Sequence, residues 1–404
     1  MMGTPSIARV GALSCVIGLF GACGADPVSQ PVEDAAGQVA GGVPTGEGAE
    51  DAVTSELADD VVTPEQDTVG EQTADANGDV STAVMDAVIQ PEGDALEVDT
   101  EEAQDTTEPV VWTKPCMGAI EYCDRPYNQF AQVCTHNAMS NGEDGFTLPA
   151  PNQAFSFTTQ LNDGVRCMML DTYQHKGEPY LCHGVCGIWG ERPLLDGLQE
   201  IAAWMDEHPR EVVTFIMQSN LDEAVFHQSL IDAGLASETG APSDEDVLYF
   251  HDAPPGTPWP SLGEMLAEDQ RLVVFTDDPA ANGSWHLDWQ VYGWETPYGD
   301  ESFPCVDGRG DPTAYDHQVF ILNHYTLCAL GGCIETALEN NAFAFALERA
   351  QTCWQVDPAM NPWGQIPTFI NVDNYHAPTL GGEDDRADIF EVVEILNSQW
   401  PGPP

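Results

Sequence analysis

The sequence predicts a TIM-type β/α barrel over residues 111–404, and three observations support this α/β fold class. After Trp112, short apolar segments alternate with longer segments of helical periodicity. Several of the apolar segments carry no polar face, as is typical of parallel strands covered by helices. About eight such strands within about 290 residues favour a barrel over an open doubly wound sheet.

The elements follow one another in the order that a barrel needs. The expected strands are 130–134, 166–171, 180–183, 212–217, 247–250, 272–276, 319–323 and 368–373. The expected helices are 194–207, 221–233, 261–268, 334–351 and 386–398. Polar residues stand at or just past the carboxyl ends of six expected strands: His136, Asp171, His183, Gln218, Asn323 and Asp373. In barrels this end carries the catalytic residues.

Residues 1–23 are typical of a bacterial export signal. Arg9 is the only basic residue, and the apolar run 10–22 is too short to span a bilayer. The run ends at Cys23 after small residues, like a lipoprotein cleavage site, although Phe20 stands where that pattern prefers leucine. Lipidation of Cys23 is favoured over an ordinary secretory signal. We therefore expect a lipid-anchored protein of the cell envelope or extracellular space.

Residues 24–110 contain no Lys, Arg or aromatic residue and many Asp and Glu. Such a segment buries too little apolar surface to offset the entropy of ordering. It is predicted to be a disordered acidic linker, with the barrel domain following at residues 111–404.

The formal net charge is −56, and only Lys114 and Lys176 supply lysine. So acidic a surface repels nucleic acid and anionic bilayers, and we expect no nucleic-acid partner. Any phosphate site must then make its positive field locally, from Arg166, a metal ion or backbone amides.

Two of the twelve cysteines, Cys15 and Cys23, lie in the signal segment, and the other ten indicate up to five disulfides. Three pairs are close enough for local loops: Cys116 with Cys123, Cys182 with Cys186, and Cys328 with Cys333. The connectivity stays open. A zinc site at 182–186 is the alternative, but no second ligand pair has finger-like spacing.

Two histidines carry most of the functional signal. His136 follows one expected strand and His183 ends another, with Arg166 and Asp171 between them in the chain. Two imidazoles near a cation and a carboxylate suit acid–base cleavage of a phosphodiester. One imidazole takes a proton from the attacking oxygen, and the other gives one to the leaving oxygen.

Residues 127–400 resemble the phosphatidylinositol-specific phospholipase C X-domain-like proteins of the PLC-like phosphodiesterase superfamily. The matching motifs are Thr135-His136-Asn137, Gln160–Arg166, Met169–Tyr173, Cys182-His183-Gly184, Trp204–Val213 and Phe369–Tyr375.

The resemblance implies roles for four residues. His136 resembles the general base that deprotonates a ring hydroxyl beside the phosphodiester, and His183 the general acid that protonates the departing alkoxide. Asp373 resembles the carboxylate that orients a catalytic histidine. Arg166 is either a phosphate contact or a buried structural pair, and both alternatives stay open.

The resemblance also bears on calcium. Asn137 and Asp171 match ligands of calcium-dependent members, but Met169 and Gln218 stand where those members have carboxylates. Calcium takes six to eight oxygen ligands, several of them charged. The sequence therefore predicts at most a weak Ca²⁺ site, with Gln218 as a third candidate ligand. Metal-independent members carry an arginine where this chain has Asp171.

The sequence thus predicts a monomeric phosphoric diester hydrolase or lyase of phospholipase C type, acting on a phospholipid or another phosphodiester. The alternative is a catalytically weak barrel that binds a surface ligand, motivated by Met169 and Gln218. A glycerophosphodiester or sphingolipid phosphodiesterase is less favoured. The segment 307–311, Asp-Gly-Arg-Gly-Asp, is expected to be a solvated turn rather than an adhesion tripeptide or a calcium loop.

Overall fold

The computed structural model describes residues 110–147, 150–238, 246–251, 253–278, 285–327, 334–376 and 388–402. These residues belong to the second of two compact units, Met1–Asp99 and Thr100–Pro404. The predicted signal peptide with Cys23, the predicted linker up to residue 109, and the Cys328/Cys333 pair lie outside the described residues. No described helix combines the length and apolarity that crossing a membrane requires.

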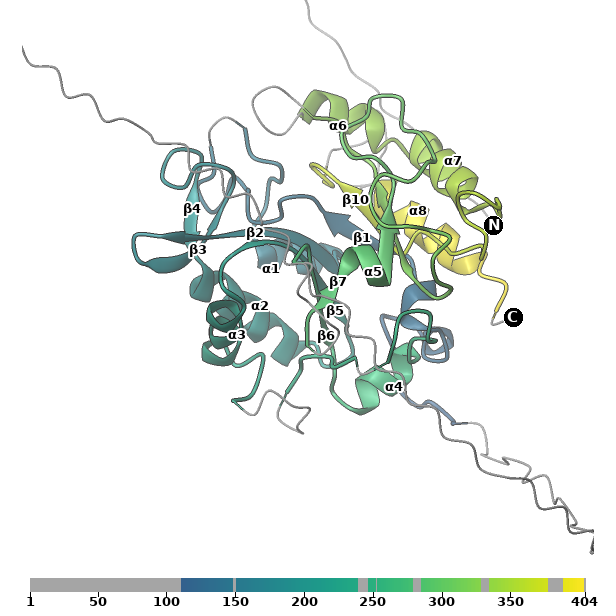
Figure 1. Cartoon of the computed structure of the whole chain (residues 1–404), viewed down its shortest axis with the longest axis horizontal. Helices are drawn as coiled ribbons and strands as arrows, with labels where there is room; N and C mark the ends of the chain where they lie inside the picture. Colours follow the sequence, from purple (N-terminus) through teal and green to yellow (C-terminus); the bar gives the residue numbers. More distant parts are fainter. Residues whose placement is uncertain are drawn as a thin grey trace, which may run out of the picture. The chain divides into compact units, whose positions relative to one another are not determined.

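The core of the second unit is a parallel sheet that curls into a barrel (Figure 1). Its strands follow the order β7-β6-β5-β2-β1-β10-β9-β8. Their bounds are β1 Gln132–Thr135, β2 Cys167–His175, β5 Val213–Asn220, β6 Leu272–Thr276, β7 Leu287–Asp288, β8 Gly293–Glu295, β9 Val319–Asn323 and β10 Phe369–Val372. The end strands β7 and β8 are joined by the four-residue helix α5, Trp289–Tyr292, which brings the two sheet edges near each other. The predicted fold class is confirmed, with no pairing between β7 and β8 among the described residues.

Two predicted barrel strands were wrong. Residues 180–183 belong mostly to β3, Glu178–Cys182, which pairs antiparallel with β2 and with β4, Glu191–Pro193. The reason is that β2 runs on past the barrel to His175 and turns back there. Residues 247–250 form only an isolated bridge at Leu248. Strands β7 and β8, which complete the sheet instead, are too short to show an apolar pattern.

Helices cover the outside of the sheet (Figure 1). They are α1 Phe157–Asp163, α2 Leu194–Glu207, α3 Glu223–Asp232, α4 Leu262–Ala267, α6 Ile334–Asn340, α7 Phe343–Trp354 and α8 Asp388–Ser398, with 3₁₀ turns at Ile120–Tyr122 and Tyr127–Gln129. The single helix predicted over 334–351 is divided at Asn341. At this break, the buried side chain of Asn341 donates a hydrogen bond to the backbone carbonyl of Asp373, at 2.9 Å.

The alternation of side chains along each strand separates an outer core from an inner one. In β2, Met168 and Leu170 pack toward the helices, whereas Cys167 and Met169 belong to the inner cluster. Asp171 continues the inner series at the carboxyl end of the strand. The twofold period of β2 therefore delivers a carboxylate to the mouth of the barrel.

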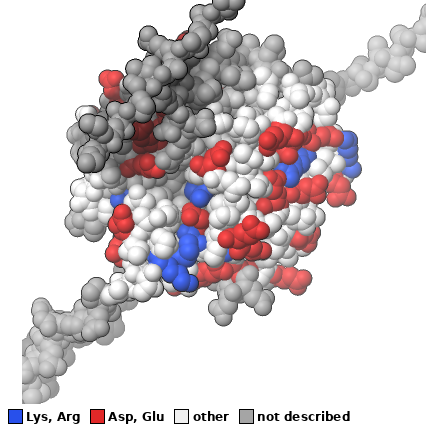
Figure 2. All heavy atoms as spheres, turned by 180° about the vertical axis from the view of Figure 1, so that it is seen from behind, with Lys and Arg blue, Asp and Glu red and all other residues white. Residues whose placement is uncertain are grey.

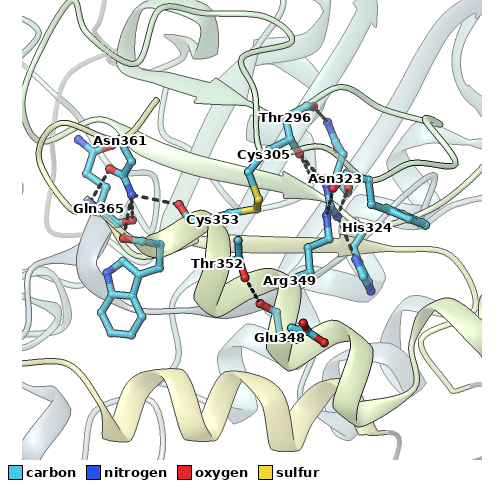
Figure 3. Close-up of a disulfide and its surroundings, with 12 residues drawn as sticks. Thr296, Cys305, Asn323, His324, Glu348, Arg349, Thr352, Cys353, Asn361 and Gln365 are labelled. Carbon is cyan, nitrogen blue, oxygen red and sulfur yellow. Dashed lines mark hydrogen bonds between the residues drawn. A yellow bond between two sulfur atoms is a disulfide. The ribbon is translucent and has the colours of Figure 1, made fainter. Parts of the chain in front are cut away.

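Four disulfides join described cysteines: Cys116–Cys123, Cys134–Cys167, Cys182–Cys186 and Cys305–Cys353. The first and third confirm two of the predicted local loops. The sulfur atoms of Cys182 and Cys186 are bonded to each other, so the alternative of a zinc site at 182–186 is wrong. Cys305–Cys353 ties the segment between β8 and β9 to helix α7 (Figure 3).

Next to that disulfide, the buried Arg349 of α7 holds the same segment to the sheet (Figure 3). Its Nη1 donates to the carbonyl of Asn323 at 2.6 Å and lies 2.9 Å from Nδ1 of His324, while Nη2 donates to Thr296 at 3.3 Å. Burial lowers the pKa of Arg349 to about 9. Nε donates to the carbonyl of Phe303 at 3.2 Å, so this one side chain serves acceptors on three segments.

Replacing Arg349 by methionine is expected to lower the free energy of unfolding by about 2–3 kcal/mol, because several buried acceptors lose their donor. Guanidinium unfolding monitored by tryptophan fluorescence measures the change. Glu348→Met, on the exposed side of the same helix, is the matched control. Equal stabilities of Arg349→Met and the control would contradict this role.

Candidate active site

A cavity of about 410 Å³ lies at the carboxyl ends of the barrel strands. Its lining includes five of the predicted site residues: His136, Asn137, Asp171, His183 and Gln218. The remaining lining residues are Met169, Tyr173, Gly184, Ile216, Met217, Asp277, Trp289, Tyr298, Arg309, Tyr325 and Leu327. The structure therefore brings both histidines to one cavity, as the sequence predicted.

His136 is held by the strand next to its own. Strands β1 and β10 pair in parallel with Thr135 beside Val372, so the residues that follow them, His136 and Asp373, meet. Nδ1 of His136 lies 2.9 Å from Oδ1 of Asp373, which also accepts from Asn152 at 3.0 Å. The ring of His136 stacks on Tyr325, with centroids 3.9 Å apart. With Nδ1 donating to the carboxylate, Nε2 is the nitrogen that accepts a proton.

His183 enters the cavity from the hairpin. It follows β3 directly and stands beside the Cys182–Cys186 disulfide. Its Nδ1 lies 3.4 Å from the hydroxyl oxygen of Ser140. Burial lowers the pKa of His183, the charge of His136 lowers it further, and Asp373 opposes both. The two imidazoles are thus close enough to affect each other's protonation.

Asp171 is a buried carboxyl group in the same cavity. Burial raises the pKa of Asp171 to about 7, the charge of His136 opposes this shift, and Asp277 adds to it. Near neutral pH the group therefore exists in both protonation states. Gln218 is its neighbour on β5, in register with Asp171.

The described donors around Asp171 make at most a weak site for a calcium ion. Asn137 and Gln218 offer neutral amide oxygens, and Met169 offers a thioether sulfur, which calcium does not favour. Among the described residues no group of three or more His, Cys, Asp or Glu side chains could hold a metal ion. Calcium needs more, and more highly charged, oxygen ligands. Calcium at Asn137 and Asp171 stays a prediction, and no step of the proposed reaction passes through it.

Arg166 lies away from this cavity. It precedes β2 at the opposite end of the barrel, where Nε donates to Glu211 at 2.9 Å and the guanidinium stacks on Trp204. Nη1 donates to the carbonyls of Leu161 and Val165. Of the two alternatives left open, the structural pair holds, and the prediction that Arg166 contacts phosphate was wrong.

Asn323 is a second polar strand-end residue that does not line the cavity. It is buried, and its side chain bonds Thr296 and Asn371 instead.

Sequence reasoning missed several cavity residues. Asp277 directly follows β6, so the strand-end rule would have found it. Arg309 lies in the segment expected to be a solvated turn, where no periodicity marks it. Trp289 and Tyr298 flank the Arg309 guanidinium, at 4.6 and 5.0 Å from their ring centroids.

The fold and the cavity define a barrel protein with a carboxylate-oriented histidine facing a second histidine. The family model PI-PLC X 1 matches residues 122–381, and the chain belongs to this PI-PLC X family.

Three curated relatives are similar to this chain. An "Uncharacterized secreted protein" of Arthroderma benhamiae is 28% identical over 71% of this chain and 64% of its own length. A "PI-PLC X domain-containing protein 1" of the same organism is 32% identical over 52% and 68%. A PI-PLC X domain-containing protein of Arabidopsis thaliana is 26% identical over 67% and 62%. The match spans slightly less than two thirds of two of these relatives.

Solved structures give weaker likenesses. A mutant phosphatidylinositol-specific phospholipase C from Staphylococcus aureus has a TM-score of 0.41 and 14% identity over 67% of this chain and 94% of its own. PLC21 from S. officinalis has a TM-score of 0.31 and 19% identity over 40% of this chain and 19% of its own.

Proposed function

We propose that this protein is a phosphoric diester hydrolase or lyase of phospholipase C type. One observation carries the proposal: a histidine oriented by a carboxylate, His136 with Asp373 at 2.9 Å, shares one cavity with His183. The membership in the PI-PLC X family supports it. The proposed substrate is an inositol phospholipid or a phosphodiester of similar shape.

The proposed reaction needs two proton transfers. Nε2 of His136 takes the proton of a hydroxyl next to the phosphodiester, and that oxygen attacks phosphorus. The bond from phosphorus to the alkoxide oxygen breaks, and Nε2 of His183 donates its proton to that oxygen. The products are an alcohol and a five-membered cyclic phosphate. Asp373 keeps Nδ1 of His136 protonated and stabilises the imidazolium that forms.

The edge of the cavity supports a lipid substrate. Tyr298 and Leu327 line the cavity and are exposed, and Val185 and Ile188 are exposed on the loop that follows His183. Apolar side chains around a polar cavity suit a substrate presented at a lipid surface.

Two observations support an extracellular location. The four disulfides indicate an oxidising compartment. The name of one relative says that it is secreted. Anchoring through a lipidated Cys23 belongs to this proposal.

Turnover of phospholipid vesicles by the full chain tests the function. Asp and Glu are spread over the face shown in Figure 2, with few Lys and Arg among them. Because an acidic protein is repelled by an anionic bilayer, phosphatidylinositol diluted into phosphatidylcholine should be cleaved faster than pure phosphatidylinositol. Release of a water-soluble inositol phosphate by the wild-type chain, and its loss in His136→Ala, would support the proposal.

The alternative, a catalytically weak barrel that binds a surface ligand, predicts vesicle binding without turnover. Glycerophosphocholine and sphingomyelin as further substrates distinguish the less favoured phosphodiesterase types. Turnover of these two alone would contradict the inositol phospholipid assignment.

The value of kcat/KM is expected to fall as pH rises through neutrality. His183 must be protonated to act as an acid, and burial and His136 lower its pKa, so activity falls as pH rises. Asp171, with a pKa of about 7, becomes anionic over a similar range and repels the phosphodiester. A profile that keeps rising to about pH 8 would contradict His183 as the acid.

A further inference from the structure

The cavity needs a cation for an anionic substrate, and the described residues offer one. Asp171 and Asp277 place carboxyl groups in the cavity, while Arg166 is at the other end of the barrel. Among the described lining residues, Arg309 is the only Lys or Arg. The positive charge that a phosphodiester requires must therefore be sought at Arg309.

The backbone around Arg309 is fixed against strand β8. Arg309 forms a bridge with Glu295, whose N–H donates to the carbonyl of Arg309 at 2.9 Å. In return, the N–H of Gly308 donates to the carbonyl of Glu295 at 2.7 Å. The Cys305–Cys353 disulfide ties the same segment to α7 (Figure 3). The backbone of this segment is therefore held in place beside the cavity and is more than a solvated turn.

Glycine is required on both sides of Arg309. A Cβ on Gly308 would lie 2.8 Å from the backbone nitrogen of Pro297. Gly310 has a φ of +76°, and its Cβ would lie 2.5 Å from the carbonyl oxygen of Gly293. No side chain fits so close to β8, so the Gly-Arg-Gly sequence lets the segment lie flat with one long side chain between the two glycines.

The guanidinium is oriented with part of its donor capacity unused. Nε donates to the buried Glu295 carboxylate at 2.5 Å, and the group lies over Trp289 and Tyr298. Among the described residues, none accepts a hydrogen bond from Nη1 or Nη2, and the side chain is 42% exposed. Two parallel N–H groups on a fixed plane are the geometry that binds two phosphate oxygens.

The guanidinium lies near the histidine end of the cavity. Tyr325 stacks on His136, and burial raises the pKa of Tyr325 while the charge of Arg309 lowers it. Arg309 and His136 thus both lie near Tyr325.

We propose that Arg309 binds the phosphoryl oxygens of the substrate and is the cation that stabilises charge developing there during attack. This inference rests on the proposed function. The positive charge at the cavity then comes from Arg309, in the segment between β8 and β9. Asp171 offers a carboxyl group there, and the described residues form no cluster of charged ligands for calcium. The Glu295 carboxylate positions the guanidinium without contacting the substrate.

Two variants test Arg309 while keeping the buried Glu295 from being left as an unpaired charge. Arg309→Lys retains the charge but not the fork, and should lower kcat/KM about 10²-fold. The double variant Glu295→Gln/Arg309→Gln removes both charges and should lose at least as much. Inhibition by inorganic phosphate should weaken in parallel. Arg210→Lys, at the opposite end of the barrel, makes the same substitution away from the cavity and is the matched control for Arg309→Lys.

The outcomes separate this inference from the proposed function. If both Arg309 variants melt like the wild-type chain and keep its kcat/KM and phosphate inhibition, while His136→Ala is inactive, the assignment of Arg309 is wrong and the function stands. If no phosphodiester is cleaved, but inorganic phosphate binds in calorimetry and Arg309→Lys abolishes binding, Arg309 is confirmed and the function is wrong.

Discussion

Replacing His136 or His183 by alanine is expected to lower kcat for an inositol phospholipid by about 10²–10⁴-fold each. His136 has its Nδ1 fixed by Asp373 and its Nε2 free to accept a proton. His183 faces the same cavity. The double variant should lose little more than the worse single variant, because acid and base act in one transition state.

The leaving group distinguishes the two histidines. In a nitrophenyl ester of inositol phosphate the nitrophenolate departs as a stable anion and needs no proton, so His183→Ala should recover much of its loss with this substrate. His136→Ala should not, because the attacking hydroxyl still needs a base. Steady-state kinetics with both substrates measures the difference. His227→Ala, on helix α3 outside the cavity, is the control. Equal losses of both variants on both substrates would contradict the assigned roles.

Replacing Asp171 by asparagine is expected to stabilise the protein at high pH. The pKa of Asp171 is about 7 in the folded chain and 3.8 in its ordinary state, because burial disfavours the anion. Below the ordinary value both states are protonated and the carboxyl group costs nothing. As pH rises through the folded pKa, the cost reaches on the order of 4 kcal/mol.

Asparagine has a similar shape and no charge, so the gain of Asp171→Asn should be full above about pH 8 and absent near about pH 4. Guanidinium unfolding of both proteins across this range measures it. Asp206→Asn, on the exposed side of α2, is the control for a surface carboxylate. A stability difference that does not change with pH would show that burial does not raise the pKa of Asp171.

Sequence patterns located the barrel but not the two end strands of its sheet, β7 and β8. The apolar runs that became β5, β6 and β9 are continuous, and burial on both faces explains why they stand out. Strands β7 and β8 have two and three residues, too few for any period. Residues 180–183 have an apolar pattern, but only the turn after β2 decides that they pair antiparallel.

Most of the candidate site residues were predictable because they follow strands. His136, Asp171 and Asp373 were all found by their position, and the parallel register of β1 and β10 then brings two of them together. The phosphate contact predicted for Arg166 was wrong because this residue precedes β2, and the amino ends of the strands lie opposite the cavity. Arg309 escaped detection because a bridge and two close backbone approaches place it, and neither leaves a periodic signal.

The product of the reaction tests the central claim most directly. The full chain is incubated with phosphatidylinositol diluted into phosphatidylcholine, and the water-soluble products are followed by phosphorus NMR. Intramolecular attack assisted by His136 and His183 predicts an early signal from a five-membered cyclic phosphodiester, which His136→Ala removes. A chain that releases only the open phosphate monoester from the first turnover, or that releases the cyclic product equally well without His136, would contradict the account.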